Sequence, residues 1–88
     1  WTYRSPLRLE RRAVKAACVR FSARILRAKG MIRFPGDVDA EIHVVGNRWK
    51  VAPYQGPALR ETLLVFIGLL DIHEQQALAC LLDAAALP

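Results

Sequence analysis

The residues with the most chemistry to offer are basic, and they gather near the N-terminus. Residues 7–30, LRLERRAVKAACVRFSARILRAKG, hold eight Arg or Lys residues among 24, with Glu10 as the only acid. Arg outnumbers Lys eight to two in residues 1–33, and guanidinium groups bind phosphates and carboxylates in a bidentate manner. This density of Arg favours a partner that carries many negative charges.

The charge of the 88-residue chain is unevenly distributed. Residues 1–33 contain ten basic residues and one acid, and therefore carry +9, whereas residues 34–88 contain three basic and seven acidic residues and carry −4. The sum is the net charge of +5. A basic arm or face on a neutral or acidic body is typical of proteins that bind a polyanion.

Groups suited to catalysis or metal binding are scarce. His43 and His73 are the only histidines, and each is expected at a polar surface position rather than as a general base. The acids Asp37, Asp39 and Glu41 surround a turn, but they lack the spacing of an oxygen-ligand loop. The sequence also lacks a Gly-rich phosphate-binding loop. We therefore expect no enzyme activity, no catalytic residues, no cofactor and no metal site.

The cysteines and the apolar runs bound the environment of the protein. Cys18 and Cys80 are 62 positions apart and form no C-x-x-C pair, so we expect free thiols in the cytoplasm or another reducing intracellular compartment. The longest apolar run, residues 63–70, is much shorter than the roughly 20 residues that cross a membrane. The chain begins at Trp1 rather than Met, which leaves open whether it is a fragment of a longer protein.

A long N-terminal helix is predicted to present the basic residues. Ser5 is a favoured N-cap, Pro6 suits the first helical position, and Gly30 suits the C-terminal end. At 100° per residue one apolar stripe runs along residues 6–29, and its members are Leu7, Val14, Ala17, Cys18, Phe21, Ile25 and Ala28. We therefore expect a helix over residues 6–29 with one buried face, whose first turns project from the body as a positive arm.

The middle of the chain predicts a three-stranded antiparallel meander over about residues 31–53. After a first strand MIRF, the segments AEIHVV and RWKVAP flank a two-residue turn at 46–47 and form a hairpin. The register pairs Val44 with Trp49 and places Trp49 on the core face. The opposite face then carries His43, Val45, Arg48 and Lys50.

The last third of the chain predicts a helical pair over about residues 57–87. Pro57 opens the first of these helices, and Asp71 starts the second as the N-cap of a capping box. The architecture is therefore a single α+β domain, residues 1–88, with the order α-β-β-β-α-α. The apolar excess of residues 57–88, and Leu64 on an otherwise polar side of the first helix, favour a homodimer through these helices.

Together these features predict a small non-enzymatic binding module whose Arg-rich helix contacts a polyanion, with nucleic acid as the favoured partner. The alternative is a protein-interaction module, an assembly subunit or an inhibitor, that docks on an acidic protein surface. The predicted polyanion-binding residues lie on the helix and the hairpin: Arg4, Arg8, Arg11, Arg12, Lys15, Arg20, Arg24, Arg27, Arg48 and Lys50.

Overall fold

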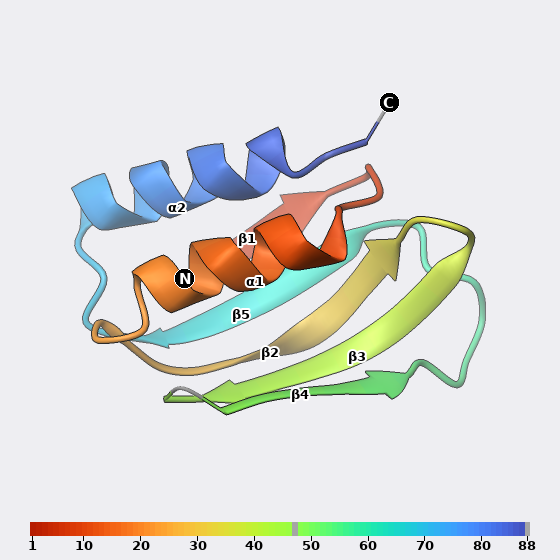
Figure 1. Cartoon of the computed structure of the whole chain (residues 1–88), viewed down its shortest axis with the longest axis horizontal. Coiled ribbons are helices and arrows are strands. Elements are labelled where there is room, and N and C mark those ends of the chain that lie inside the picture. Colours follow the sequence, from red (N-terminus) through yellow and green to blue (C-terminus); the bar gives the residue numbers. More distant parts are fainter. Residues whose placement is uncertain (47, 88) are drawn as a thin grey trace.

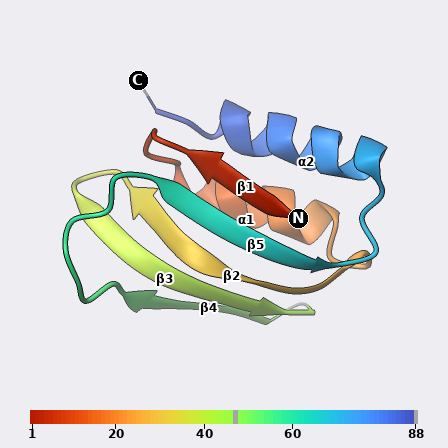
Figure 2. The same cartoon turned by 180° about the vertical axis from the view of Figure 1, so that it is seen from behind.

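The chain folds into a five-stranded antiparallel sheet with two helices on one side. A computed structural model describes residues 1–46 and 48–87. Figures 1 and 2 show both helices on the same side of the sheet. The strands lie in the order β1-β5-β2-β3-β4. Along the chain the elements are β1 (Thr2–Ser5), α1 (Arg11–Arg20), β2 (Ile25–Phe34), β3 (Val38–Val45), β4 (Arg48–Pro53), β5 (Thr62–Gly68) and α2 (Ile72–Ala84).

The predicted helix over residues 6–29 is correct only for its middle part. α1 begins after Glu10, whose carboxylate accepts hydrogen bonds from the backbone N–H groups of Arg12 and Ala13 at 3.1 and 2.7 Å. A side-chain oxygen at this position satisfies backbone donors that a helix start leaves free. Three members of the predicted apolar stripe are buried in this helix, namely Val14, Ala17 and Cys18.

Residues beyond this helix form β2 instead of continuing it. A β-bulge separates Ile25 from Arg27, and it allows both Ile25 and Ala28 to be buried although they are three positions apart. Spacing by three is also helical spacing, which is why these two residues matched the helical stripe. After the bulge the strand alternates regularly, with Ile32 and Phe34 buried.

Gly30 has a structural role that differs from the predicted helix end. It lies inside β2, where a Cβ atom would collide with the backbone carbonyl oxygen of Leu63 in β5. A glycine inside a strand often marks such a close approach of another backbone. Gly30 therefore permits the pairing of β2 with β5.

The first predicted helix of the C-terminal pair is wrong, because its residues form β5. This strand pairs with β1 on one side and β2 on the other, and its inner residues Thr62, Leu64 and Phe66 are buried. Leu64 is fully buried and does not lie on a polar surface, so the argument for a homodimer through Leu64 has no basis.

The predicted architecture, a long N-terminal helix with a three-stranded meander and two C-terminal helices, is therefore wrong. The chain is mostly sheet, and the β2-β3-β4 meander is only part of it. Two strands are added to that meander. The start of the chain forms β1 where a helix cap is predicted, and β5 replaces a predicted helix.

The hairpin of β3 and β4 is confirmed in its register. Val44 pairs with Trp49 and Val45 with Arg48, and Trp49 packs half-buried against the core. Gly46 has φ 58, the left-handed conformation that hairpin turns require. The predicted Gly-Asn turn type depends on Asn47, which lies outside the described residues.

The capping box at the start of α2 is confirmed as well. The Asp71 carboxylate accepts a hydrogen bond from the Glu74 backbone N–H at 2.8 Å, and the Glu74 carboxylate accepts one from the Asp71 backbone N–H at 3.1 Å. Leu78 and Leu82 are fully buried against the sheet layer. Over the described part of the chain, neither helix is long and apolar enough to cross a membrane.

Candidate functional site

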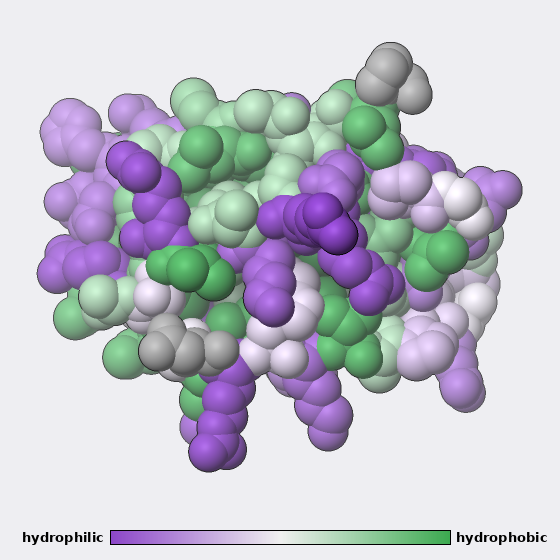
Figure 3. All heavy atoms as spheres, viewed as in Figure 1, coloured by the Kyte–Doolittle hydropathy of each residue, from purple (hydrophilic) through white to green (hydrophobic). Residues whose placement is uncertain are grey.

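The two faces of the sheet have different surroundings. α1 and α2 lie over one face, and no helix of the described chain lies over the other (Figures 1 and 2). Hydrophilic side chains project from the sheet on the side away from the helices, whereas the surface at α2 is largely hydrophobic (Figure 3). The uncovered face, called the bare face below, is the candidate site.

The strand register arranges the bare face in three rungs, each of which crosses the sheet. Side chains that alternate outward on neighbouring strands lie directly opposite one another. The first rung is Ile67, Arg27, Val45 and Arg48; the second is Thr2, Val65, Lys29, His43 and Lys50; the third is Arg4, Leu63, Met31, Glu41 and Ala52.

The β5 part of the bare face is apolar. Its outward residues are Leu63, Val65 and Ile67, and Ile67 is 56% exposed. Because Leu64 and Phe66 are buried on the inner side, this strand is apolar on both sides. An antiparallel strand with one wet face normally alternates apolar and polar residues. The composition of β5 is that of a strand covered on both faces.

The β2-β3-β4 part of the bare face is basic. Arg27 and Lys29 of β2 share rungs with Arg48 and Lys50 of β4, and Val45 and His43 of the intervening β3 separate them. Within the described chain, the ion pairs involve Arg4, Arg8 and Arg24, and none of them involves these four cations. Like charges gathered on one face repel one another, so the isolated domain gains no stability from this arrangement.

His43 borders three hollows of the bare face. A hollow of about 280 Å³ lies between β2, β3 and β5. Two further hollows on either side of the same histidine measure about 350 and 300 Å³. The first hollow brings the two parts of the face together, because it is lined by Arg27, Lys29, His43, Val45, Val65 and Ile67.

The predicted polyanion-binding residues do not form one surface. Arg27, Arg48 and Lys50 lie on the bare face. On the opposite side of the molecule, Arg12, Lys15 and Arg20 belong to α1 and are exposed. Arg20 borders an apolar hollow of about 310 Å³ between the two helices.

The remaining four predicted residues make contacts within the domain. Arg4 pairs with Glu61 at 2.9 Å. The guanidinium group of Arg11 lies 4.6 Å from the centre of the Phe34 ring. Arg24 pairs with Glu74 at 3.2 Å and donates a hydrogen bond to the Leu69 carbonyl at 2.8 Å. The contacts of Arg24 tie the turn after α1 to the start of α2.

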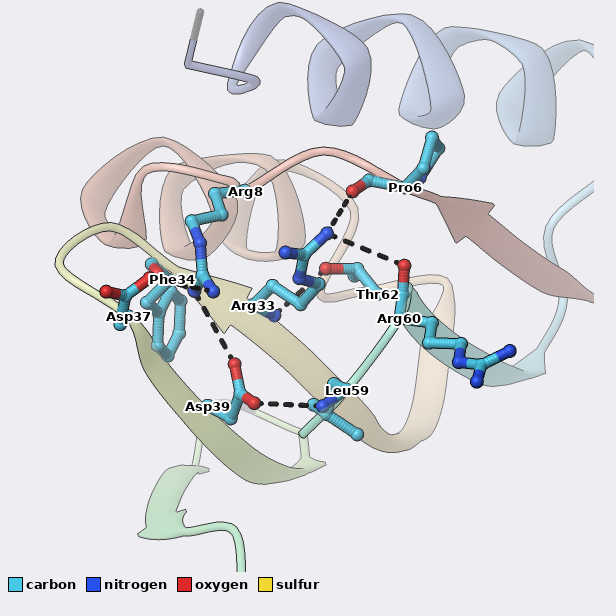
Figure 4. A network of polar contacts seen from close by, with 9 residues as sticks. All are labelled: Pro6, Arg8, Arg33, Phe34, Asp37, Asp39, Leu59, Arg60 and Thr62. Carbon is cyan, nitrogen blue, oxygen red and sulfur yellow. Dashed lines mark hydrogen bonds and ion pairs between the residues drawn. The ribbon is translucent and has the colours of Figure 1, made fainter. Parts of the chain in front are cut away.

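Arg8 is the clearest case of an internal contact, and Figure 4 shows it at one end of the sheet. It donates a hydrogen bond to the Phe34 carbonyl at 2.7 Å and pairs with Asp37 and Asp39 at 3.2 and 3.5 Å. Asp39 also accepts a hydrogen bond from the Leu59 backbone N–H at 3.0 Å. The prediction that the first turns of a helix project Arg8 as part of a free positive arm is therefore wrong.

Arg33 extends the same network toward β1. Its guanidinium donates hydrogen bonds to the backbone carbonyls of Pro6 and Arg60, and its backbone N–H donates to the Thr62 hydroxyl at 3.0 Å (Figure 4). The network joins the β1–α1 connection to the ends of β2 and β5. It holds the chain together and leaves Arg8 and Arg33 unavailable for a partner.

Lys29 and His43 lie on the bare face but are absent from the predicted binding residues. The predicted helix ends at Lys29, and His43 is predicted to be an ordinary surface residue. The alternation of basic residues in ILRAKGMIRF is the signal that identifies Lys29, since Arg27, Lys29 and Arg33 recur at even spacing. The hairpin register places His43 beside Lys50, but it does not place β2 next to β3.

The described residues offer little for catalysis. They contain no group of three His, Cys, Asp or Glu side chains that could hold a metal ion. Cys18 is buried, and burial raises the pKa of its thiol to about 11, so that it is a poor nucleophile at neutral pH.

Comparison with known proteins gives one family and one fold. The family described as the cobalamin synthesis protein cobW C-terminal domain matches residues 1–86. The crystal structure of Zn(II)-bound YjiA GTPase from E. coli is similar with a TM-score of 0.74 at 14% identity, and a Zn(II)-bound triple mutant of that GTPase with 0.72 at 15%. Each match covers 99% of this chain and 29% of the other chain. No curated protein matches the sequence.

Proposed function

The chain belongs to the family described as the cobalamin synthesis protein cobW C-terminal domain, and from this we propose that it is a non-catalytic domain of a GTP-hydrolysing protein. In this proposal the bare face of the sheet docks on another part of the same polypeptide. The chain spans only about 29% of the similar GTPase chain, which leaves room there for a GTP-binding part. The 88 residues themselves lack a Gly-rich phosphate-binding loop.

The hypothesis of a module that uses an Arg-rich helix against nucleic acid is wrong. The family match identifies a different kind of protein, and the structure contains no helix over residues 6–29. The basic residues of that segment lie in α1, in β2 and in internal ion pairs. The same findings count against a free-standing assembly subunit or inhibitor that docks through this helix.

The observation that carries the proposal is the apolar outer side of β5. Leu63, Val65 and Ile67 form a continuous apolar strip along a strand whose inner side is already filled. Exposed contiguous apolar surface on a domain marks a contact with another part of a protein. A face of five strands and three rungs covers about 500 Å² on each side, because strands lie about 4.8 Å apart and same-face residues about 6.8 Å apart. The two partner surfaces together would bury about 1,000 Å², which falls within the range of interfaces between domains of one chain, about 600–1,500 Å².

The Zn(II) bound to the similar GTPase is not assigned to this domain. The part of the chain that the structure describes holds no cluster of three suitable ligands, and structural zinc sites require four. The residues present do not fit a zinc ion. The role proposed for the domain therefore involves contacts with protein only.

Two free cysteines support a reducing intracellular compartment for the protein. Cys18 is buried and Cys80 is exposed, and they are unpaired. Unpaired cysteines are typical of compartments in which thiols stay reduced.

A pair of matched isoleucines tests the docking face. Ile67 on the bare face and Ile72 at the start of α2 are 56% and 59% exposed. In the longer polypeptide that carries this domain, Ile67→Glu should free the domain, because a charge in an apolar contact is costly. Small-angle scattering should then show a larger radius of gyration, and limited proteolysis should cleave beside the domain.

The control is Ile72→Glu, which introduces the same charge away from the bare face. It should leave the scattering curve and the proteolysis pattern unchanged. If Ile67→Glu also leaves both unchanged, the bare face does not dock on the polypeptide. GTP hydrolysis by the isolated 88-residue chain would contradict the proposed non-catalytic role.

A further inference from the structure

The basic rung of the bare face specifies the chemistry of what docks there. We infer that Lys29, His43 and Lys50 receive carboxylates from an acidic strip of the GTP-binding part of the same polypeptide, while Leu63, Val65 and Ile67 receive its apolar side chains. This inference rests on the proposed function and adds the charge of the partner surface to it.

The first argument is the lack of internal partners for the charge. Arg27, Lys29, Arg48 and Lys50 surround His43 on three adjacent strands, and they form no ion pair within residues 1–46 and 48–87. Arg4, Arg8 and Arg24 are ion-paired. The exposed Arg12, Lys15 and Arg20 of α1 form no ion pair either, so what distinguishes the present group is its clustering on neighbouring strands. The described acids of the domain therefore leave this clustered charge available for an external anion.

The second argument is that the nearest acidic residue does not neutralise this group. Glu41 is the outward acid closest in register to this group, because it lies one rung from His43 and diagonal to both lysines. It forms no ion pair with either lysine within 4.0 Å. One carboxylate facing four cations leaves a strong positive excess, which attracts a surface of opposite charge.

The third argument is the spacing of the cations, which suits several separate carboxylates better than one small anion. Lys29 and Lys50 lie on strands that are two positions apart, so their backbones are separated by about 10 Å. The rung continues without interruption into Val65 of β5. A partner must therefore carry several spaced negative groups beside apolar ones, which is the pattern of a folded protein surface with an apolar centre and a charged rim.

The lysines of the chain provide the test and its control together. Lys15, Lys29 and Lys50 are the three lysines; Lys29 and Lys50 lie on the bare face, whereas Lys15 lies on α1. A water-soluble carbodiimide joins an amine to a carboxylate only where the two are in contact. Treatment of the full-length polypeptide, followed by mass spectrometry, should give crosslinks from Lys29 or Lys50 to Asp or Glu residues outside this domain.

Lys15 should give few or no crosslinks to the same acidic residues. The inference is overturned if Lys29 and Lys50 crosslink only to acids within residues 1–88, or if Lys15 reaches the external acids as often as they do. Mixing isotope-labelled and unlabelled protein identifies crosslinks between two copies. Such mixed crosslinks from Lys29 or Lys50 would replace the inferred occupant with a second copy of the chain.

A charge-removal variant separates this inference from the proposed function. Lys29→Gln combined with Lys50→Gln should weaken docking at low salt at least tenfold, measured as the rate of proteolysis beside the domain, and Lys15→Gln should not. If Ile67→Glu frees the domain while the double variant has no effect, the bare face docks but the partner strip is not acidic. If neither change has an effect, the proposed docking itself is wrong.

Discussion

β3 and β5 belong to the same sheet and are equally buried on their inner sides, but their outer sides differ. The outer side of β3 carries Asp39, Glu41 and His43 before Val45, whereas the outer side of β5 carries only Leu63, Val65 and Ile67. The residues of β3 therefore suit a strand with one buried and one solvent-exposed face, whereas those of β5 suit a strand with both faces buried. The comparison indicates that the bare face is not uniform, since one part requires cover and the other requires only opposite charge.

The same difference explains why the sequence predicts one strand and not the other. Alternation of polar and apolar residues identifies β3, because a period of two has no helical interpretation. TLLVFIG lacks alternation, and a short apolar run cannot be assigned to strand or helix from its periodicity alone. β5 is not predicted because it lacks alternation, and the same lack of alternation supports the proposal that its outer side docks on another surface.

The largest expected effects come from the inner sides, where the two strands should behave alike. Ile42 in β3 and Leu64 in β5 are both fully buried. Replacement of either by Ala should lower the free energy of unfolding by about 2–5 kcal/mol, because it removes buried methyl groups and leaves a cavity. Urea unfolding followed by circular dichroism measures this loss. A loss below about 0.5 kcal/mol for Leu64→Ala would mean that β5 does not face the core.

A smaller effect is expected in β4, which pairs with β3 at the edge of the sheet. Trp49 is only half-buried against the core, opposite the buried Val44. Trp49→Ala should therefore cost about 1–3 kcal/mol, less than the 3–5 kcal/mol of a fully buried aromatic residue. Thermal or urea unfolding checks the value. A cost as large as that of Leu64→Ala would show that the edge of the sheet is covered more completely than β3 alone allows.

The predictable parts of the fold are those that local chemistry determines. The β3–β4 register follows from alternation and a two-residue turn, and the start of α2 follows from Asp71 and Glu74, three residues apart. β1 and β5 are not predictable in this way. They pair across about 60 residues of chain, so each depends on a partner that no local pattern reveals.

The candidate site is predictable only in part, for a related reason. The alternation within the hairpin is sufficient to place His43, Arg48 and Lys50 on one face. Lys29 joins them only because β2 pairs with β3, and the β-bulge near Ile25 gives this strand a helical spacing. The unpaired state of these cations does not follow from charge counts, since Arg8 and Arg24 have equal charge and do form ion pairs.

An effect of about 1–2 kcal/mol is expected where β1 pairs with β5 at the other edge of the sheet. Tyr3 is buried, and its hydroxyl donates a hydrogen bond to the Asp83 carboxylate of α2 at 2.6 Å. Tyr3→Phe removes this bond and should cost about 1–2 kcal/mol at neutral pH, since a hydrogen bond to a charged group is stronger than average. Urea unfolding at pH 7 measures the cost. An unchanged stability would show that β1 is held by its pairing with β5 alone.

The same tyrosine should give the protein a dependence on alkaline pH. Burial, and then the hydrogen bond to Asp83, raise the pKa of Tyr3 far above its usual value of about 10. The folded state thus holds this proton more tightly than the unfolded state, so its contribution is complete below about pH 10 and is lost progressively as the pH rises from there toward the raised pKa. Unfolding between pH 9 and 11 should show a steeper loss for the natural chain than for Tyr3→Phe. Equal slopes would contradict the raised pKa.

The smallest effects on stability are expected on the outer sides, where β3 and β5 should differ in another property. Ile67 and Glu41 are exposed on the bare face, so Ile67→Thr and Glu41→Thr should each change the unfolding free energy by less than about 0.5 kcal/mol. Ile67→Thr also interrupts the apolar strip of Leu63, Val65 and Ile67, and a dye that fluoresces on apolar surface should therefore bind the folded chain less. Glu41→Thr serves as the control, because it changes the outer side of β3 and leaves that strip intact. Equal dye binding by both variants would mean that the strip is not a continuous apolar surface, and the contrast between the two strands would then be one of sequence only.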